Sequence, residues 1–456
     1  MQPLHLTLLQ ISLAVGTLFA VLLVGHILRQ RRNPASTLAW LLFVVTLPWL
    51  AVPAYLSFGT RKLQPRLAAA TAPHPRADDH TPLDRLLDSA ALPPLRNGHT
   101  VDWHADGDAA RSALMHTLAQ ARHRLDIALF LLRDDASGRA LCDALVARAA
   151  DGVAIRLLID GVGSFLLRRP VITRLQAAGV SVAWFIPLLH RPFHARSNLR
   201  NHRKLVLTDG HLAWLGGRNV ADEYFAPDSR WVDLSLSLTG PVVADLVQLF
   251  DSDWGFATRT PPASARSGSA QADRPMDTSA RAQLIAAGPD HVRDLLHESI
   301  MQLVYTAQRR IVLTTPYYIP DDALQLGLCL AARRGVSVTL LLPARSNHRL
   351  ADVARGRYLR ELALAGVRVR LLPDAMLHAK AWLIDDEALT GSANLDLRSL
   401  FLNFELMLRV RGEAETAWLQ DWLDRLDACS QPAPATPAGF VQELLEGVVL
   451  LTAFQL

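Results

Sequence analysis

The sequence has little cysteine and, near its start, no acidic residue at all. Its 456 residues include three cysteines, which are too few and too scattered for a disulfide framework or a thiolate metal site. The first 66 residues contain six basic residues and no acidic one, which leaves 41 of the 47 basic residues against all 43 acidic ones. The net charge beyond residue 66 is therefore −2, and this balance disfavours a nucleic-acid-binding protein, which needs excess positive charge along its footprint.

The start of the chain is apolar. Half of the sequence is hydrophobic and the mean hydropathy is +0.16, which argues against disorder. Two apolar runs, Leu4–Leu28 and Leu38–Phe58, are each long enough to span a bilayer as a helix, with Pro48 and Pro53 as points where the second would kink. The first run lacks a basic n-region and an A-x-A cleavage site, so we expect residues 1–60 to form a retained membrane hairpin. Three basic residues in its loop and three after it leave the orientation open.

The remainder divides into two similar halves. Residues 61–98 and 258–283 are rich in Ala, Pro, Ser and charged residues, which is typical of linkers. Residues 99–257 and 284–430 repeat one order of helix, glycine turn and apolar strand, as in ARAADGVAIRLLID and LAARRGVSVTLLLP. Such alternation predicts an α/β fold with largely parallel strands, present as two tandem domains.

Two further patterns place helices. An acidic pair, at 134–135 in the first half and 321–322 in the second, predicts the start of a helix. The tail, residues 431–456, ends in an apolar stretch that is short for a membrane span. We therefore expect the tail to form a helix that packs on the body or lies at a membrane surface.

Each half ends in the same short pattern, H-x-K-x4-D followed by G-[GS]-x-N. The two copies contain His202, Lys204, Asp209, Gly217 and Asn219, and His378, Lys380, Asp385, Ser392 and Asn394. Side chains two apart on a strand point to one face, so the His and Lys of each copy are expected to share one wall of a pocket. A turn after each Asp would bring the Gly and Asn positions back beside them. One copy would be a weak signal, but two copies with the same continuation are hard to obtain by accident.

This set of side chains suits phosphoryl transfer. One neutral imidazole can attack phosphorus while the other, protonated, donates to the leaving oxygen. The two Lys and two Asn side chains can hold non-bridging oxygens and stabilise the five-coordinate state without a divalent metal. Each His neighbours a Lys and no Cys, His or carboxylate cluster has ligand spacing, so we expect neither a metal site nor a cofactor.

Acidic residues complete the candidate site. Asp233 and Glu405 lie at matching points of the two halves, and we expect each to bond the second nitrogen of an imidazole and fix its tautomer. Asp209 and Asp385 belong to the motif and are grouped with the candidate catalytic residues. At a turn, however, they are expected to shape the chain or balance nearby charge.

The paired motifs resemble the paired HKD motifs of the phospholipase D superfamily. The phrases RRNPASTLAWLL, GGRNVADEYF, TPYYIPDDAL and GSANLDLRSLFLNFE, with the N-terminal hairpin, are similar to bacterial cardiolipin synthases of that superfamily. The resemblance implies a multi-pass enzyme of the bacterial inner membrane that needs no cofactor. It implies that a His attacks phosphatidylglycerol, that glycerol leaves, and that a hydroxyl of a second phosphatidylglycerol resolves the phosphatidyl-His to give cardiolipin.

The resemblance also implies roles for the motif residues. By similarity His202 is the nucleophile and His378 the general acid and then base, although the near-symmetry of the motifs leaves this order open on the sequence alone. The remaining polar positions are carried over as phosphate ligands or as lining of the same turn: Lys204, Lys380, Asn219, Asn394, Gly217 and Ser392.

Other functions stay open on the sequence. A phospholipase D hydrolase, or a transferase that uses another lipid such as phosphatidylethanolamine, would need the same motifs. A nuclease is disfavoured by the charge balance and the hairpin. A catalytically silent membrane scaffold is disfavoured by the two intact His–Lys pairs. The acyl preference, the second lipid, the membrane side and the oligomeric state are not encoded in any pattern found.

Overall fold

The computed structural model describes residues 18–29, 34–59, 80–187, 198–226, 228–260, 280–434 and 437–451, with Gly16 and Lys62. The chain forms two compact units. One comprises Met1–Leu63 with Leu189–Leu199, and the other comprises Gln64–Leu188 with Arg200–Leu456. The candidate site residues all belong to the second unit.

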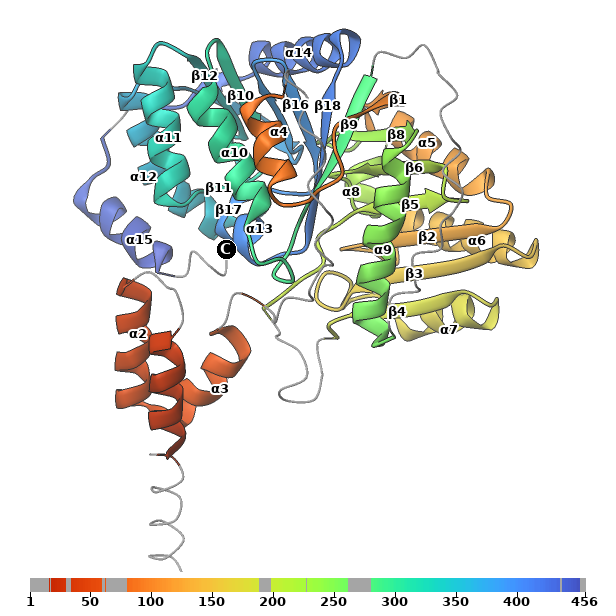
Figure 1. The fold of residues 1–456 in the computed structure, drawn as a ribbon, viewed down its shortest axis with the longest axis horizontal. Helices are drawn as coiled ribbons and strands as arrows, with labels where there is room; N and C mark the ends of the chain where they lie inside the picture. The colour runs from red at the N-terminus through yellow and green to blue at the C-terminus, as the bar shows by residue number, and fades with distance from the viewer. Residues whose placement is uncertain are drawn as a thin grey trace, which may run out of the picture. The chain divides into compact units, whose positions relative to one another are not determined.

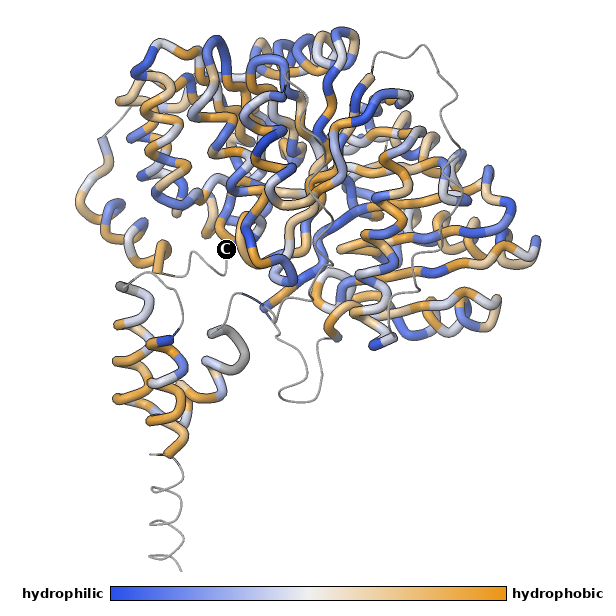
Figure 2. Tube along the Cα trace, viewed as in Figure 1, coloured by the Kyte–Doolittle hydropathy of each residue, from blue (hydrophilic) through white to orange (hydrophobic). Residues whose placement is uncertain are grey.

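The smaller unit is helical and apolar. Residues 18–29 form a helix, followed by α2 (Pro34–Thr46) and α3 (Pro48–Phe58), and Figure 2 shows α2 as mostly hydrophobic. Leu23, Ile27 and Val44 pack with Tyr55 in a small core. The second apolar run is not one helix, because Pro48 cannot donate the hydrogen bond that would continue α2 and instead begins α3.

The described residues cover only part of the predicted hairpin. Most of the first apolar run lies outside the described residues. Among the residues that the structure describes, no helix has both the length and the apolar character needed to cross a membrane.

The larger unit is built on one 15-stranded mixed sheet (Figure 1). Across the sheet the strands are β19 (Gln431–Pro432), β13 (Arg368–Leu372), β12 (Ser337–Pro343), β10 (Arg310–Thr314), β15 (Ala381–Ile384), β16 (Glu387–Gly391), β18 (Glu405–Arg411), β9 (Ala280–Ala287), β1 (Arg96–His104), β8 (Ser235–Thr239), β6 (Leu212–Gly216), β5 (Leu205–Thr208), β2 (Arg124–Leu129), β3 (Ala154–Asp160) and β4 (Ser181–Phe185). The order is mirrored about the contact between β9 and β1, so the sheet consists of two equivalent halves joined edge to edge.

Each half combines a parallel and an antiparallel part. In the first half β2, β3 and β4 are parallel, whereas β5, β6 and β8 continue the sheet in antiparallel pairing. The second half repeats this with β10, β12 and β13, then β15, β16 and β18. The predicted α/β fold in two tandem domains is confirmed. The expectation of largely parallel strands is wrong, because the turns after Asp209 and Asp385 reverse the chain and give antiparallel neighbours. The strands are buried on both faces, which explains their continuous apolar sequence.

Helices cover both faces of each half. In the first half α5 (Gly107–Ala119), α6 (Ala136–Ala150) and α7 (Arg169–Ala177) share one core, and α9 (Val242–Thr258) packs elsewhere on the sheet. In the second half α10 (Leu295–Thr306), α11 (Asp322–Arg333) and α12 (Arg349–Leu364) share a core, with α14 (Glu413–Ala428) outside it. The predicted helix starts are confirmed, because Asp135 caps α6 and Asp321 caps α11 through their side-chain oxygens.

Short elements connect these layers. They are α8 (Asp222–Phe225), β7 (Trp231–Val232), β11 (Tyr318–Ile319), β14 (Met376–Leu377), β17 (Leu395–Asp396) and α13 (Leu397–Phe401). Two of them, β14 and β7, pair in parallel although one belongs to each half.

The expected linker 61–98 is wrong for its second part. Residues 82–88 form α4 (Pro82–Asp88), and β1 begins at Arg96. Leu83 and Leu87 of α4 are buried in the core of the second half, and Asp84 bonds Arg409 there at 2.5 Å. The apolar spacing of these two leucines drives the segment onto the second half before the chain enters the first.

The tail, residues 431–456, also contains secondary structure. Gln431–Pro432 adds strand β19 at the sheet edge, and α15 (Phe440–Leu450) packs against α12. The part of the tail after residue 451 lies outside the described residues.

Candidate active site

The two His–Lys pairs lie at the start of equivalent strands. His202 and Lys204 directly precede β5, and His378 and Lys380 directly precede β15. The expectation that these residues lie within a strand is therefore wrong. The two lysines lie one position before the strand and the two histidines lie three positions before it. The reason is a change of partner, because the segment before each strand pairs with the other half of the molecule instead of continuing the sheet.

Short backbone pairings bring the two motifs together. The amide of His202 donates to the carbonyl of Phe404 at 2.9 Å, and Phe404 N–H donates back to Arg200 at 2.8 Å. In the equivalent place His378 N–H donates to the carbonyl of Val232 at 2.7 Å. Each motif is thus held by a strand segment from the opposite half.

Through the same pairings, each half supplies the carboxylate that bonds the imidazole of the other half. Glu405 of the second half accepts from Nδ1 of His202 of the first, at 2.9 and 3.0 Å. Asp233 of the first half accepts from Nδ1 of His378 of the second, at 2.7 Å. Since Nδ1 holds the proton in each bond, the neutral tautomer presents the Nε2 lone pair to a substrate.

Burial controls the charge of both imidazoles. Burial lowers the pKa of His202 to about 4, and Lys204 opposes protonation while Glu405 favours it. Burial and then the charge of Lys380 lower the pKa of His378 to about 3, against the pull of Asp233. Both rings are therefore neutral near pH 7 before substrate binds.

The carboxylates stay ionised despite being enclosed. Burial raises the pKa of Asp233, but electrostatic attraction to His378 and Lys380, together with the hydrogen bond from His378, outweighs it and brings the pKa to about 2. For Glu405 the same opposition leaves the pKa below its usual range, with His202 and Lys204 as the main partners. Each pair is thus a neutral imidazole on a fixed carboxylate.

Both lysines point back at their own motif. Lys204 Nζ donates to the carbonyl of His202 at 2.6 Å and lies 5.3 Å from the ring centre of Phe130. Lys380 Nζ lies 2.8 Å from Nδ1 and 3.1 Å from Nε2 of His378. Burial lowers the pKa of Lys380 to about 8 and that of Lys204 well below its usual value. Both ammonium groups therefore gain from an incoming anion.

The two motif asparagines are buried beside the histidines. The Asn219 amide donates to the Tyr224 hydroxyl at 2.8 Å, and the Asn394 amide donates to Asp396 at 2.9 Å. The Oδ1 atom of each is buried without a hydrogen-bond partner. Such a group has polar capacity left for a ligand or a water.

Gly217 and Ser392 contact the carboxylates. A Cβ at Gly217 would lie 2.2 Å from Oδ1 of Asp233, so only glycine leaves room for that carboxylate. At the equivalent point the Ser392 hydroxyl donates to Glu405, and it accepts from Leu406 N–H at 3.0 Å. Both positions therefore contact the acids that bond the imidazoles, and their expected part in lining the phosphate stays a prediction.

Asp209 and Asp385 are engaged by backbone amides. Asp209 accepts from residues 122–124 at 2.6–2.8 Å, and Asp385 accepts from residues 308–310 at 2.9–3.0 Å. Both residues have positive φ, near 50°, at the turn after their strand. Both carboxylates thus anchor the hairpin turn that follows each His–Lys segment, in line with the expectation that they shape the chain.

Several residues around the site were not identified from the sequence. The ring of Phe130 packs edge-on to His202, with ring centres 4.8 Å apart, whereas Tyr224 and Trp231 both lie 5.3 Å from His378. Ser399 and Asn403 donate to Glu405 at 2.8 and 3.3 Å. Most of them lie near a motif or its acid in the sequence, which does not specify contact, whereas Phe130 lies 72 residues before His202 and carried no sequence signal.

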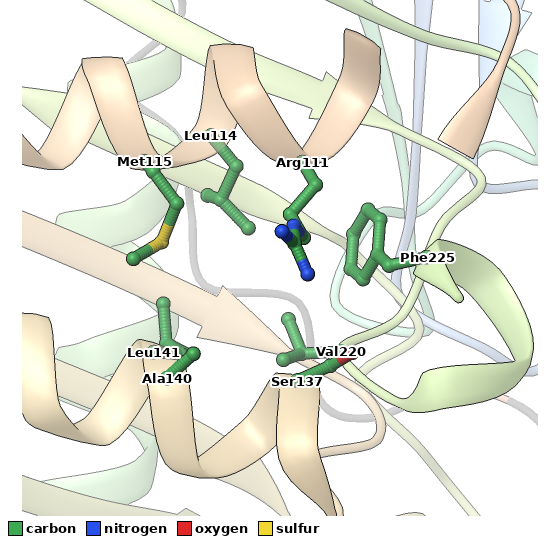
Figure 3. Close-up of a pocket in the computed structure, with 8 residues that line it drawn as sticks. All are labelled: Arg111, Leu114, Met115, Ser137, Ala140, Leu141, Val220 and Phe225. Atoms are coloured by element: carbon green, nitrogen blue, oxygen red, sulfur yellow. The ribbon is translucent and has the colours of Figure 1, made fainter. Parts of the chain in front are cut away.

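A cavity elsewhere in the first half is separate from these residues. It has a volume of about 150 Å³ between α5 and α6, and Figure 3 shows Arg111 pointing into it beside Phe225. None of the candidate site residues lines it. Among the described residues, no group of three or more His, Cys, Asp or Glu side chains could hold a metal ion.

Comparisons with known proteins agree with this architecture. The family described as cardiolipin synthase, PLD-like domain, matches residues 114–254 and 300–426, and the phospholipase D-nuclease N-terminal family matches residues 18–59. Cardiolipin synthase A of Klebsiella pneumoniae is 32% identical over 416 residues, which cover 84% of each chain. Cardiolipin synthase A of Pseudomonas fluorescens is 34% identical over 426 residues, covering 88% of this chain and 87% of that one.

A solved structure supports the fold independently. The phosphatidylserine synthase of Haemophilus influenzae superposes with a TM-score of 0.62, covering 82% of this chain and 98% of that one at 14% identity. At that identity the likeness concerns the fold alone. The family match spans more than half of this chain and falls on both sheet halves that carry the His–Lys motifs. The chain therefore belongs to the cardiolipin synthase family of phospholipase D-like proteins.

Proposed function

We propose that this chain is a cardiolipin synthase that transfers a phosphatidyl group from one phosphatidylglycerol to another and releases glycerol. The observation that carries the proposal is the exchange of carboxylates between the halves, which sets two neutral, oriented imidazoles in one buried site. Family membership supports the choice of lipid substrates.

In the first step His202 acts as the nucleophile. Its Nε2 forms a bond to phosphorus, the bond from phosphorus to the glycerol oxygen breaks, and the proton of His378 Nε2 passes to that oxygen. Glycerol leaves and a phosphatidyl-His202 remains. Glu405 stabilises the positive charge that develops on the His202 ring.

Binding of the phosphodiester favours the protonated form of His378, which this step requires. The two lysines, two carboxylates and two neutral imidazoles carry no net charge together when both lysines are protonated. A bound phosphodiester adds one negative charge, which opposes the effects that lower the pKa of His378 and so favours its protonation. Lys204, Lys380, Asn219 and Asn394 are the proposed holders of the non-bridging oxygens.

In the second step a hydroxyl of another phosphatidylglycerol is the acceptor. Its oxygen bonds to phosphorus, its proton passes to His378 Nε2, and the bond from phosphorus to His202 breaks. The product is cardiolipin, His202 is neutral again, and His378 is protonated again, as it was with phosphatidylglycerol bound. The proton that His378 took up when the phosphodiester bound is released to solvent when the product leaves. We further propose that the N-terminal hairpin anchors the enzyme as a multi-pass protein of the bacterial inner membrane, where anchoring raises the effective concentration of both lipids.

A product assay tests the reaction. Purified full-length protein is given phosphatidylglycerol alone, with chelator, and the products are identified by mass spectrometry. Cardiolipin and glycerol in equal amounts, both lost in His202→Ala and His378→Ala, support the proposal. Phosphatidic acid without cardiolipin would identify water as the acceptor and the protein as a hydrolase. No turnover of this lipid, with turnover after phosphatidylethanolamine is added, would identify a different phosphatidyl exchange.

A second experiment assigns the two histidines. A phosphatidyl ester of p-nitrophenol has a leaving group that needs no general acid, so the first step depends on the nucleophile alone. We expect His378→Ala to release one equivalent of nitrophenol and retain phosphatidyl on His202, and His202→Ala to release none. The reverse pattern would exchange the two roles.

A further inference from the structure

Exposed apolar side chains occur at equivalent places in the two halves. After β3, the loop 161–168 carries Phe165 and Leu166, which are 57% and 66% exposed. After β12, the first turns of α12 carry Leu350 and Val353, which are 51% and 39% exposed. We call these four residues the apolar rim. Both segments follow the carboxyl end of a parallel strand, where α/β sheets place their ligand sites.

The first part of the rim is fixed to His202. Ser164, one residue before Phe165, donates to the carbonyl of Phe130 at 3.1 Å, and its hydroxyl accepts from Leu132 N–H at 3.0 Å. The Phe130 ring is the one that packs on His202. Asp160, at the start of this loop, accepts from the amide of Asn201 at 3.0 Å.

The second part is fixed to the second motif. Tyr317 donates to Asn347 at 2.6 Å, directly before α12, and packs in one cluster with Ala351 and Leu397. Leu397 follows Asp396, which accepts from the motif residue Asn394. Both segments that carry the rim are therefore linked through hydrogen bonds and packing to the residues of the two motifs.

Helix α15 packs against α12 and leaves an apolar stripe exposed. Glu446 is 2% exposed and pairs with Arg360 of α12 at 2.9 and 2.5 Å. The last residues of the helix join the cluster of Tyr317, and Figure 1 shows the helix beside α12. The outward stripe at spacing four is apolar: Phe440, Leu444 and Val448 are 81%, 57% and 55% exposed. A helix that faces water typically carries polar residues along its outward stripe.

We propose that the apolar rim and the outward stripe of α15 dock on a bilayer of anionic phospholipid, so that lipid enters the site directly from the membrane surface. The inference rests on the proposed function. Exposed arginines accompany the apolar side chains, namely Arg169 after the first loop and Arg345, Arg349 and Arg357 around the second. Phe and Leu side chains flanked by arginine are typical of surfaces that insert into anionic head groups.

A bilayer fits better than a second protein molecule as the occupant. The two segments that carry the rim are linked to the segments that hold the histidines, where a lipid substrate must bind, and exposed arginines lie beside them. A bilayer is both the cover of the apolar side chains and the source of substrate.

The first test separates docking from chemistry. Full-length Phe165→Ser/Leu166→Ser and Leu350→Ser/Val353→Ser are assayed on phosphatidylglycerol vesicles and on short-chain phosphatidylglycerol dissolved as monomers. We expect kcat/KM to fall at least tenfold on vesicles and less than twofold on monomers. Leu364→Ser is the matched control, because Leu364 is 89% exposed on the same helix but about 21 Å further along it.

Equal kcat/KM of the variants and the control on vesicles would overturn the docking proposal, as would equal losses on both substrates. If the wild type makes no cardiolipin from either substrate, the proposed function fails, and the docking is then decided by a measurement independent of turnover.

That measurement places a fluorophore on the surface. In a Cys429→Ser background, Phe165→Cys, Leu444→Cys and Leu364→Cys are labelled and the full chain is reconstituted in phosphatidylglycerol vesicles that contain spin-labelled lipid. Quenching at 165 and 444 but not at 364 supports bilayer docking. Fluorescence that changes with protein concentration but is not quenched would identify a second copy as the occupant and overturn the proposal.

Discussion

His202 and His378 occupy equivalent positions in the two halves, yet their neighbours differ. Glu405, the partner of His202, also accepts from the side chains of Ser392, Ser399 and Asn403. Asp233, the partner of His378, accepts otherwise from Leu234 N–H at 2.7 Å. The comparison teaches that the repeat places two similar imidazoles at equivalent points, and that the different groups around each carboxylate support the separate roles proposed for them.

The side chains that pack against the two imidazole rings also differ. His202 meets the apolar ring of Phe130, whereas His378 lies between Tyr224 and Trp231 with Lys380 against its nitrogens. A firmly held carboxylate on an apolar wall suits a ring that must stay in place while it is covalently bound. A ring whose proton affinity responds to a nearby ammonium suits proton transfer.

The largest expected effect on kcat comes from replacing the two carboxylates, and the burst with the p-nitrophenyl ester distinguishes their roles. Asp233→Asn and Glu405→Gln remove the charge that orients each imidazole and should each lower kcat by about 10²–10⁴. With the p-nitrophenyl ester, Asp233→Asn should still give a one-equivalent burst, and Glu405→Gln should give none. The same burst from both variants would contradict the division of roles, and circular dichroism checks that both proteins are folded.

A smaller effect tests the residues beside the acids. Gly217→Ser introduces the residue type that the second half has at the equivalent position. It forces a Cβ against Asp233, so we expect kcat to fall at least tenfold. Ser392→Gly copies the first half into the second and removes one of the bonds to Glu405, for which a loss of a few-fold is expected. Steady-state rates with phosphatidylglycerol measure both. A larger loss for Ser392→Gly would show that the two positions do not differ as the contacts indicate.

The pH dependence follows from Lys380. Its pKa of about 8 means that the side chain is a cation below that pH and loses its charge above it. Loss of this charge above about pH 8 should make kcat/KM, which reports the free enzyme, fall more steeply with pH, by up to a further tenfold per pH unit. Lys380→Arg keeps its charge and should lack this additional decline, even if its rate at pH 7 is lower. An unchanged decline in the variant would assign it to another group, provided that thermal melts at pH 7 and 9 agree.

The smallest effect concerns the third residue of each motif. Asp209→Asn and Asp385→Asn weaken bonds to three backbone amides and should each lower the free energy of unfolding by about 1 kcal/mol. The rate should change less than threefold, because neither carboxylate bonds an imidazole. Urea unfolding and the product assay measure the two quantities. A loss of rate with unchanged stability would place these residues in the catalytic group.

Much of the fold was predictable because it depends on local patterns. Continuous apolar strands alternating with capped helices predicted the two α/β halves, although not the antiparallel part of each sheet, and Asp135 and Asp321 marked helix starts by their position alone. The segment around α4 was assigned to a linker because seven residues carry too short a pattern, and its two leucines are buried only by a core that lies far along the sequence. The break at Pro48 was underestimated for a similar reason, since a proline can either bend a helix or begin a new one.

The sequence by itself determined which residues could do the chemistry: two imidazoles, two ammonium groups and two acids at repeated spacing. Only the tertiary structure decided how they combine. Glu405 serves His202 and Asp233 serves His378, each across the contact between the halves. The physical reason is that backbone pairing between Asn201 and Phe404, and between β14 and β7, forms only when the two halves fold against each other. Spacing along one chain encodes a turn or a strand face, but it does not encode which of two similar partners will lie within hydrogen-bond distance.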